Sequence, residues 1–449
     1  MTRDETVALF LECEARRAEA RAAALAGKSE AEVPDSAHEV AKAHWNAWAE
    51  ALLAERKALE ERGLWAVQND PWGSLKPKNA ETRAWIKRAE ADFSRCLFLI
   101  RGPEGLKETA EDRDKPEAET PPIAPIRIDN DYINMGGFVF PGRTLFARTT
   151  FQGDTSFDSA SFKDFVQFAR ATFQGTAVFN SATFSGAASF VSVTFLGYAR
   201  FANATFRSGA GFASATFRSY TNFSQAEFGG DASFAGVKVE RAFTMTGAVF
   251  IRVPAFNQAN FAQAPDLDDV KFPLPRFLRA SKKDLIAQYR ALRRMAIQGS
   301  DYEREQMAFK GEIRSKRGTD HRWYHAAFWY GLAYDALSDF GRSMSRPSLA
   351  WLLSIGVFAL FFLVSAGKLE SAFADCTAAG APNYESALVI SWKNALPLLG
   401  DAKAEEVART CLYGAAAYRG AAIQGIQKVW SALLLFLFLL AVRNQFKIK

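Results

Sequence analysis

The segment FARATFQGTAVFNSATF, residues 168–184, decides the fold, because its phenylalanines are separated alternately by five and six residues. The same alternation runs from Phe140 to Phe272, so the sequence repeats every eleven residues. Every position of this ladder is apolar: Phe140, Phe146, Phe151, Phe157, Phe162, Phe168, Phe173, Phe179, Phe184, Phe190, Phe195, Phe201, Phe206, Phe212, Phe217, Phe223, Phe228, Phe234, Val239, Met245, Phe250, Phe256, Phe261, Leu267 and Phe272. The residue two places earlier is usually alanine. The pattern therefore pairs one large and one small apolar residue in each unit.

An eleven-residue period also suits a right-handed coiled coil. Gly, Ser, Thr and Asn are too frequent here for a continuous helix, since each of them disfavours a helix interior. Short repeats with fixed large and small inward residues are typical of a solenoid. We therefore predict a solenoid in which each phenylalanine stacks on the one a coil below.

The unit Ala171-Thr172-Phe173-Gln174-Gly175 resembles the Phe-centred repeats of the pentapeptide-repeat family, and the resemblance extends over roughly 138–272. It implies a right-handed, four-sided β-helix of about six coils, or about 30 Å of stack. Val239 and Met245 replace phenylalanine, so we expect one distorted coil at 237–245. No acid, His or Cys pattern repeats along the ladder, which indicates a scaffold without chemistry of its own.

Composition limits the functional classes. The chain has 449 residues and a net charge of +6, which gives room for several domains but is too little charge to indicate a nucleic-acid partner. The basic balance also disfavours the DNA mimicry that the resemblance would otherwise suggest. Four cysteines are too few for a disulfide-rich fold, and the N-terminus lacks the apolar core of a signal peptide. We expect the N-terminal part in the cytoplasm.

The remaining segments are helical or irregular. Apolar residues at helical spacing over 2–26 and 36–63 predict an αα-hairpin. The second helix has an apolar stripe from Trp45 to Leu64. We expect this stripe to pack on the first helix or on the end of the solenoid, or alternatively on another subunit. A third helix over about 80–92 leads into a stray repeat unit. The expected domains are a helical domain (1–100), a flexible charged and Pro-rich linker (101–128), the β-helix (129–272), a capping αα-hairpin (273–320), an interfacial aromatic helix (321–346) and a two-helix transmembrane domain (347–449).

The C-terminal domain contains two apolar runs long enough to cross a bilayer, at 347–367 and 420–443. Basic residues precede the first run and follow the second. Both termini are therefore expected in the cytoplasm, and the 368–419 loop outside a bacterial inner membrane. Cys376 and Cys411 then lie in an oxidising compartment, and we predict a disulfide between them, while Cys13 and Cys96 stay reduced.

Between these runs, YESALVISWKNALPLLG (384–400) is too short to span and too apolar for an exposed loop. It predicts a re-entrant half-helix, since irregular backbone at membrane depth must be buried or line water. The layout resembles tetrameric cation-channel pore domains and bacterial pentapeptide-repeat proteins with a two-helix, channel-like C-terminus. A Thr-Val-Gly-Tyr-Gly filter is missing, so potassium selectivity is unsupported. The pore-lining candidates are Ser391, Lys393, Asn394, Leu398, Gly400, Asp401, Gln424, Gln427, Lys428 and Ser431.

Lys393 separates two interpretations of this segment. An intramembrane charge is unfavourable and marks function by default, and a ring of lysines would favour anions or repel cations. Alternatively, Lys393 extends its ammonium to the outer interface or pairs with Glu385.

No nucleophile elbow, phosphate loop or metal-spaced cluster is found, so we expect neither an enzyme nor a cofactor. His321 and His325 lie four residues apart and could bind a metal, but an interfacial helix also explains them. The favoured hypothesis is a homo-oligomeric membrane ion channel, tetrameric only by analogy, with a large cytoplasmic assembly; its partners are membrane lipid, inorganic ions and copies of itself. The alternative is a membrane-anchored scaffold that binds a cytoplasmic protein without conducting ions.

Overall fold

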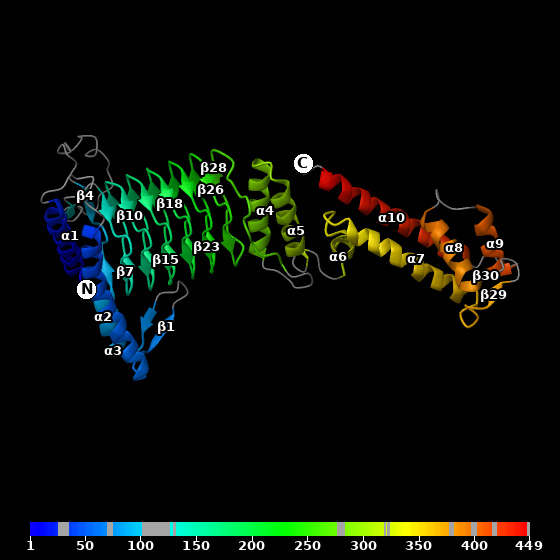
Figure 1. Ribbon diagram of the computed structural model, residues 1–449, viewed down its shortest axis with the longest axis horizontal. Coiled ribbons are helices and arrows are strands. Elements are labelled where there is room, and N and C mark those ends of the chain that lie inside the picture. The colour runs from blue at the N-terminus through cyan, green and yellow to red at the C-terminus, as the bar shows by residue number, and fades with distance from the viewer. Residues whose placement is uncertain are drawn as a thin grey trace. The chain divides into compact units, whose positions relative to one another are not determined.

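The computed structural model describes residues 1–25, 36–69, 75–100, 126–128, 132–275, 283–317, 320, 324–376, 381–396, 402–414 and 420–446. The chain divides into two compact units (Figure 1). The first comprises Met1–Pro275 and Lys283–Glu312, and the second Arg276–Lys282 and Ile313–Lys449. The helical N-terminal region, the central solenoid and the helical C-terminal region with two apolar helices are all present, as the sequence predicts.

Four parallel sheets form the sides of the solenoid, and each strand pairs with the strand 22 residues away, as in Thr155↔Ala177. The first sheet contains β6 (Ile133–Asn134), β10 (Thr155–Ser156), β14 (Ala177–Val178), β18 (Ala199–Arg200), β22 (Thr221–Asn222) and β26 (Phe243–Thr244). The second contains β7 (Val139–Phe140), β11 (Ser161–Phe162), β15 (Thr183–Phe184), β19 (Thr205–Phe206), β23 (Glu227–Phe228) and β27 (Val249–Phe250).

The third sheet contains β3 (Ala91–Asp92), β8 (Thr144–Leu145), β12 (Val166–Gln167), β16 (Ala188–Ser189), β20 (Ala210–Gly211) and β24 (Ala232–Ser233). The fourth contains β4 (Leu97–Ile100), β5 (Ile126–Ile128), β9 (Thr150–Phe151), β13 (Thr172–Phe173), β17 (Thr194–Phe195), β21 (Thr216–Phe217), β25 (Lys238–Val239) and β28 (Asn260–Phe261). The six-stranded sheets confirm about six coils. The stray unit is confirmed as part of the first coil, since Ala91 pairs with Thr144 and Phe98 with Phe151.

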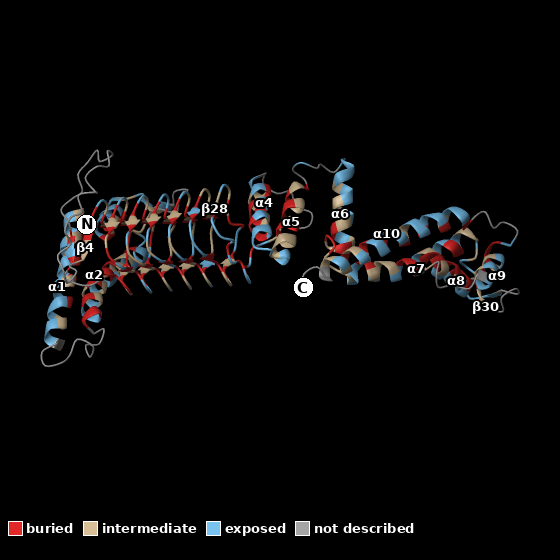
Figure 2. Cartoon of the chain, turned by 90° about the horizontal axis from the view of Figure 1, so that it is seen from above, coloured by how far each residue is buried: buried red, intermediate tan, exposed pale blue. Residues whose placement is uncertain are grey.

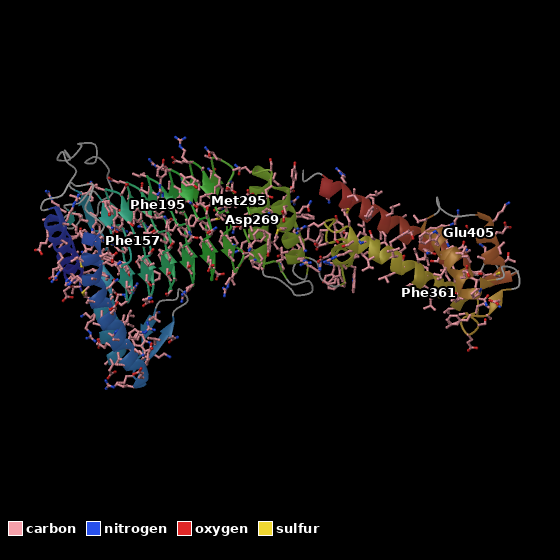
Figure 3. The ribbon with its side chains drawn as sticks, in the orientation of Figure 1. Phe157, Phe195, Asp269, Met295, Phe361 and Glu405 are labelled. Carbon is pink, nitrogen blue, oxygen red and sulfur yellow. The ribbon has the colours of Figure 1, made fainter. Side chains whose placement is uncertain are left out.

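Phenylalanine rings fill the interior in continuous stacks (Figure 3). In the column that begins at Phe140, successive rings are 4.7, 5.0, 4.6, 4.9 and 4.5 Å apart and within 7° of parallel. The ladder rings from Phe140 to Phe234 are at most 1 % exposed. Full burial of one such ring contributes about 2–3 kcal/mol, so the repeat itself supplies the core.

The expected distortion at 237–245 is not found in the backbone pairing. Val239 pairs with Phe217 on one side and with Phe261 on the other. Phe243 occupies the position of a small residue, yet its ring is 1 % exposed and packs 5.3 Å from Phe261. The shorter Val239 side chain leaves room for the Phe243 ring, so the coil keeps its register.

Helices cover the N-terminal end of the stack: α1 (Arg3–Leu25), α2 (Ser36–Glu61) and α3 (Ala80–Ala89), with a hairpin of β1 (Val67–Asn69) and β2 (Leu75–Pro77). Trp45 of α2 is fully buried and donates its indole N–H to the carbonyl of Val139 at 2.9 Å. Arg17 of α1 donates to the carbonyl of Asn134 at 2.7 Å. These bonds satisfy two backbone carbonyls at the end of the solenoid, and the helices cover that end, as a solenoid requires.

At the other end, α4 (Lys283–Gln298) and α5 (Tyr302–Lys316) follow the last coil. The Tyr289 hydroxyl donates to the carbonyl of Pro273 at 2.5 Å, and Leu292 and Met295 join the phenylalanine core. These contacts join α4 to the last coil and to the phenylalanine core.

The second unit contains α6 (Ala326–Ser338), α7 (Ser345–Ser365), β29 (Asp375–Cys376), β30 (Ala381–Pro382), α8 (Asn383–Ala395), α9 (Ala402–Tyr413) and α10 (Ala421–Phe446). The aromatic helix is shorter than expected. It ends at Ser338 because Asp339, Phe340 and Gly341 all take left-handed backbone conformations, with φ of 50°, 57° and 79°. Helix α9 was not expected from the sequence. Figure 2 shows α10 exposed along much of its length.

Candidate functional site

Two apolar helices frame the candidate site. Within α7 and α10, Ser345–Ser365 and Ala421–Asn444 are long and apolar enough to cross a membrane. A helix of this length spans about 30 Å, which is the thickness of the hydrocarbon core. Most of their exposed large side chains are apolar: Leu349, Leu352, Leu353, Val357, Leu360, Phe361, Val364, Ile426, Val429, Leu433, Leu435, Phe436 and Leu439. The charged exceptions are Arg346, Lys428 and Arg443. The two helices could therefore span a membrane.

Helix α8 packs against both of them. Its buried Ala387 and Ile390 join one apolar cluster with Phe362 of α7. Asn383, at the start of α8, donates to the carbonyl of Ser371 beyond the C-terminus of α7 at 2.9 Å. Ser391, two turns later, donates to the carbonyl of Ile355 in the middle of α7 at 2.7 Å. Helix α8 therefore runs back along α7, antiparallel to it.

A polar seam, formed by Ser391, Asn394, Gln424, Gln427 and Ser431, lies between α8 and α10. Its side chains are 0 to 9 % exposed. Gln427 Nε2 donates to the carbonyl of Ser391 at 2.8 Å and contacts the Ser391 hydroxyl at 2.7 Å. Because Ser391 also bonds to Ile355, all three helices are tied together at one level.

Several groups of the polar seam have no hydrogen-bond partner. Both side-chain amide atoms of Asn394, the Oε1 of Gln427 and the Oγ of Ser431 are buried and unpaired. An unpaired polar group in an apolar environment costs several kcal/mol. The seam is therefore the place within these helices where water or an ion would gain most by entering.

The structure brings together five of the pore-lining candidates, those of the polar seam, inside a single chain. Lys428 lies on the exposed side of α10, and Lys393 is half-buried near the end of α8. Leu398, Gly400 and Asp401 lie outside the described residues, as does most of the segment after α8, so the re-entrant path stays a prediction. Whether any candidate lines a pore also stays a prediction.

The comparison with protein families bears on the other unit. The model for pentapeptide repeats, built of nine copies, matches residues 168–216 and 190–238. Both ranges lie within the ring stacks and coils described above. The central solenoid is a pentapeptide-repeat domain. No curated protein and no solved structure matches the chain.

A pentapeptide-repeat domain is a structural scaffold, and this one extends along a single axis so that each coil contacts only its neighbours. Among the described residues, no three His, Cys, Asp or Glu side chains gather where they could hold a metal ion. His325 precedes the first turn of α6, and His321 lies outside the described residues.

One charged cluster was missed by the sequence analysis. Asp335 of α6 is fully buried and accepts two hydrogen bonds from Arg314, at 2.9 and 2.8 Å, and one from Arg317 at 3.0 Å. Arg346 of α7 donates to the backbone carbonyl of Asp335 at 3.2 Å. Asp335 is the one charged residue of α6, which was an available signal. The cluster fixes the end of α5 to α6 and α7.

The 368–419 loop carries a second constraint. Cys411 of α9 is disulfide-bonded, whereas Cys13 and Cys96 are free and buried. The Cys376 side chain lies outside the described residues, so its pairing with Cys411 stays a prediction. The Tyr413 hydroxyl lies 2.6 Å from the Ser365 hydroxyl, which ties α9 to the end of α7.

Proposed function

We propose that the chain assembles into a homo-oligomeric ion channel of a bacterial inner membrane, with both termini in the cytoplasm and the 368–419 loop outside. The pentapeptide-repeat domain and its helices form the cytoplasmic part. Two spanning helices cannot enclose a pore alone, so conduction requires several copies around one axis. The partners are membrane lipid, inorganic ions and the other copies.

One observation carries the proposal. A short helix, α8, packs against both membrane-length helices and turns polar groups, some of them unpaired, onto α10. A simple anchor needs no third helix and gains nothing from buried amides, which are unfavourable in lipid. Half-length helices beside spanning helices, with polar groups at membrane depth, suit a path for ions.

The test is the reversal potential of the purified full-length protein in a planar bilayer under a salt gradient. Wild type is compared with Lys393→Glu, because Lys393 is the charged residue in the last turn of α8. The matched control is Lys403→Glu, which makes the same charge change on the exposed face of α9. We expect discrete currents, an anion/cation preference that shifts in Lys393→Glu, and little change in Lys403→Glu.

Subunit number is measured on the same samples by native mass spectrometry. A monomer that carries no current over a wide voltage range would contradict the channel. Currents that respond equally to both substitutions would keep the channel but remove Lys393 from the ion path.

The second candidate is a membrane-anchored scaffold. It is favoured by the burial of Ser391, Asn394 and Gln427 within one chain, where they tie helices together. In that case a folded, silent protein would still bind a cytoplasmic partner through its solenoid.

A further inference from the structure

The solenoid surface carries one group of residues unlike its surroundings, at the corner between the fourth and first sheets. We call it the Tyr–Arg ridge; it consists of Leu196, Tyr198, Arg200, Arg218, Tyr220 and Arg241. The sheet register aligns these residues on consecutive coils, since Thr194 pairs with Thr216 and Ala199 with Thr221. Tyr198 and Tyr220 are 46 and 37 % exposed, and their rings lie 6.4 Å apart.

The other corners of the same coils carry mostly small, uncharged residues. The residues at equivalent places are mostly Ala, Ser, Gly, Asn and Gln, as at 180–181, 202–203 and 224–225. Tyr and Arg are enriched in protein interfaces and dominate their binding energy, whereas Ala and Ser are depleted. An outward tyrosine pair beside arginines, where the equivalent places of the same coils carry mostly small residues, therefore indicates a docking surface.

The ridge is positively charged. The Arg200 guanidinium lies 5.8 Å from the centre of the Tyr198 ring. Glu240 is the nearby acid, and it pairs loosely with Arg218 at 3.9 Å, both side chains being more than half exposed. Among the described residues, Arg241 and the adjacent Lys238 have no ion pair. The unbalanced charge must therefore be met by solvent or by a partner.

We propose that the Tyr–Arg ridge binds an acidic, extended segment of a cytoplasmic protein partner. Guanidinium groups bind carboxylates with two parallel hydrogen bonds, and tyrosine rings provide rigid apolar contact between them. Successive coils are about 4.8 Å apart, so one ridge residue meets every one or two residues of an extended chain. The proposal concerns the solenoid alone and does not rest on ion conduction.

The test is fluorescence anisotropy with purified full-length protein in detergent. The probe is a fluorescein-labelled peptide of about twelve residues built of Glu-Glu-Leu units, and the control peptide has Lys-Lys-Leu units. Tyr198→Ala combined with Tyr220→Ala should weaken binding about tenfold or more, and so should Arg218→Gln combined with Arg241→Gln. Both are surface changes, and the thermal midpoint of each variant is measured to establish folding.

The matched control is Arg207→Gln. Arg207 is equally exposed but lies eleven residues before Arg218, on the diagonally opposite corner of the coil. The Arg207→Gln variant should bind the acidic peptide with the same affinity as wild type. Equal losses in Arg207→Gln and in the ridge variants, or no selective binding of the acidic peptide by wild type, would overturn the proposal.

The chain itself has an acidic stretch with seven Asp and Glu at 104–119. A variant with these residues changed to Gln and Asn is therefore titrated in parallel. Binding seen only in that variant would mean that residues 104–119 of the chain itself occupy the ridge. The proposed partner protein would then be replaced by this segment. The channel proposal stands or falls separately, on the bilayer currents.

Discussion

Gln427 of α10 contacts two oxygens of Ser391 on α8 through one amide nitrogen, the carbonyl at 2.8 Å and the hydroxyl at 2.7 Å. Both side chains are fully buried. The pair therefore holds α8 in place against α10 at the level where Ser391 also bonds to α7. The strength of the hydrogen bonds between Gln427 and Ser391 decides whether α8 is held rigidly against α7 and α10 or can move relative to them.

Replacing Gln427 with Leu should destabilise the helical unit by about 1 kcal/mol. Interhelical hydrogen bonds in membranes contribute about 0.6 to 1.7 kcal/mol, and the loss is limited because leucine removes the unpaired Oε1 as well. The measurement is the SDS concentration that halves the helical circular dichroism signal. Gln424→Leu, one turn away and without a described hydrogen bond, is the control. A Gln424 effect as large as that of Gln427 would contradict the assigned role of the Ser391 contact.

Asp335→Asn should be much more damaging. The substitution keeps the shape of the side chain but removes the carboxylate that Arg314 and Arg317 share, at a site where Asp335 is fully buried. Breaking a buried ion pair from one side costs about 3–5 kcal/mol. Hydrogen exchange should accelerate in α6 and at the end of α5. Asp339→Asn is the control, since its contacts to Arg314 and Arg346 are 4.0 and 3.8 Å. Equal protection of α6 from hydrogen exchange in the Asp335→Asn and Asp339→Asn variants would contradict this prediction.

The ring stacks predict a steep dependence of stability on a single phenylalanine. Phe190 is fully buried, 4.9 Å from Phe168 and 4.8 Å from Phe212. Phe190→Ala should lower the free energy of unfolding by about 3–5 kcal/mol, because it leaves a cavity between two rings. The exposed neighbour gives the control, and Val191→Ala should stay within about 0.5 kcal/mol of wild type. Urea midpoints of the full-length protein measure both, and similar midpoints would rule out the stack as the source of stability.

Parts of this molecule were readable from the sequence for physical reasons. The eleven-residue ladder fixes the inward face of every unit, so the coils, their register and the stacks followed from it. Apolar runs at 347–367 and 420–443 gave α7 and α10 within a few residues. The Asp335 cluster did not follow, because it joins residues 18 and 21 positions apart on separate helices. The polar seam residues were all among the pore-lining candidates, a role that stays a prediction, but helical spacing alone does not say which neighbouring helix a polar face meets. Helix α9 was missed because its amphipathic pattern lay in a segment interpreted only by charge and cysteine content.

Glu14 should make stability depend on pH. Burial raises the pKa of the Glu14 carboxyl from its ordinary value of 4.5 to about 7, against the opposing attraction of Arg17 at 2.8 Å. The other groups around this site are the guanidinium groups of Arg21 of α1 and Arg127 of β5 and the imidazole of His38 of α2, whose Nδ1 accepts a hydrogen bond from Arg17. Since the folded state holds the proton more tightly, the free energy of unfolding should fall as pH rises from about 4.5 to about 7 and then level off.

The Glu14 effect is isolated by subtracting the free energy of unfolding of Glu14→Gln, obtained from urea denaturation, from that of wild type between pH 5 and 8. The difference should grow with pH, in favour of the variant, by no more than about 3 kcal/mol. Glu5→Gln is the control. Hydrogen bonds from Thr2 lower the pKa of exposed Glu5, so its contribution is lost only as pH falls below 4.5. A flat difference for Glu14 would mean that Arg17 keeps the carboxylate charged throughout.

The proposed external placement of the 368–419 loop predicts a defined cysteine chemistry. Cys411 is disulfide-bonded, and with Cys13 and Cys96 free, Cys376 is its expected partner. In intact cells, a membrane-impermeant maleimide should label neither cysteine before reduction and both afterwards. Cys376→Ser should make Cys411 react without reduction, because the variant lacks the disulfide partner and the proposed topology leaves the loop accessible to the reagent. Cys13 and Cys96 are the internal controls: burial raises the pKa of their thiols to about 12 and about 11, and the proposed cytoplasmic position would deny the reagent access. Labelling of Cys376 and Cys411 in untreated cells would exclude the bond, whereas labelling of Cys13 in intact cells would exclude the topology.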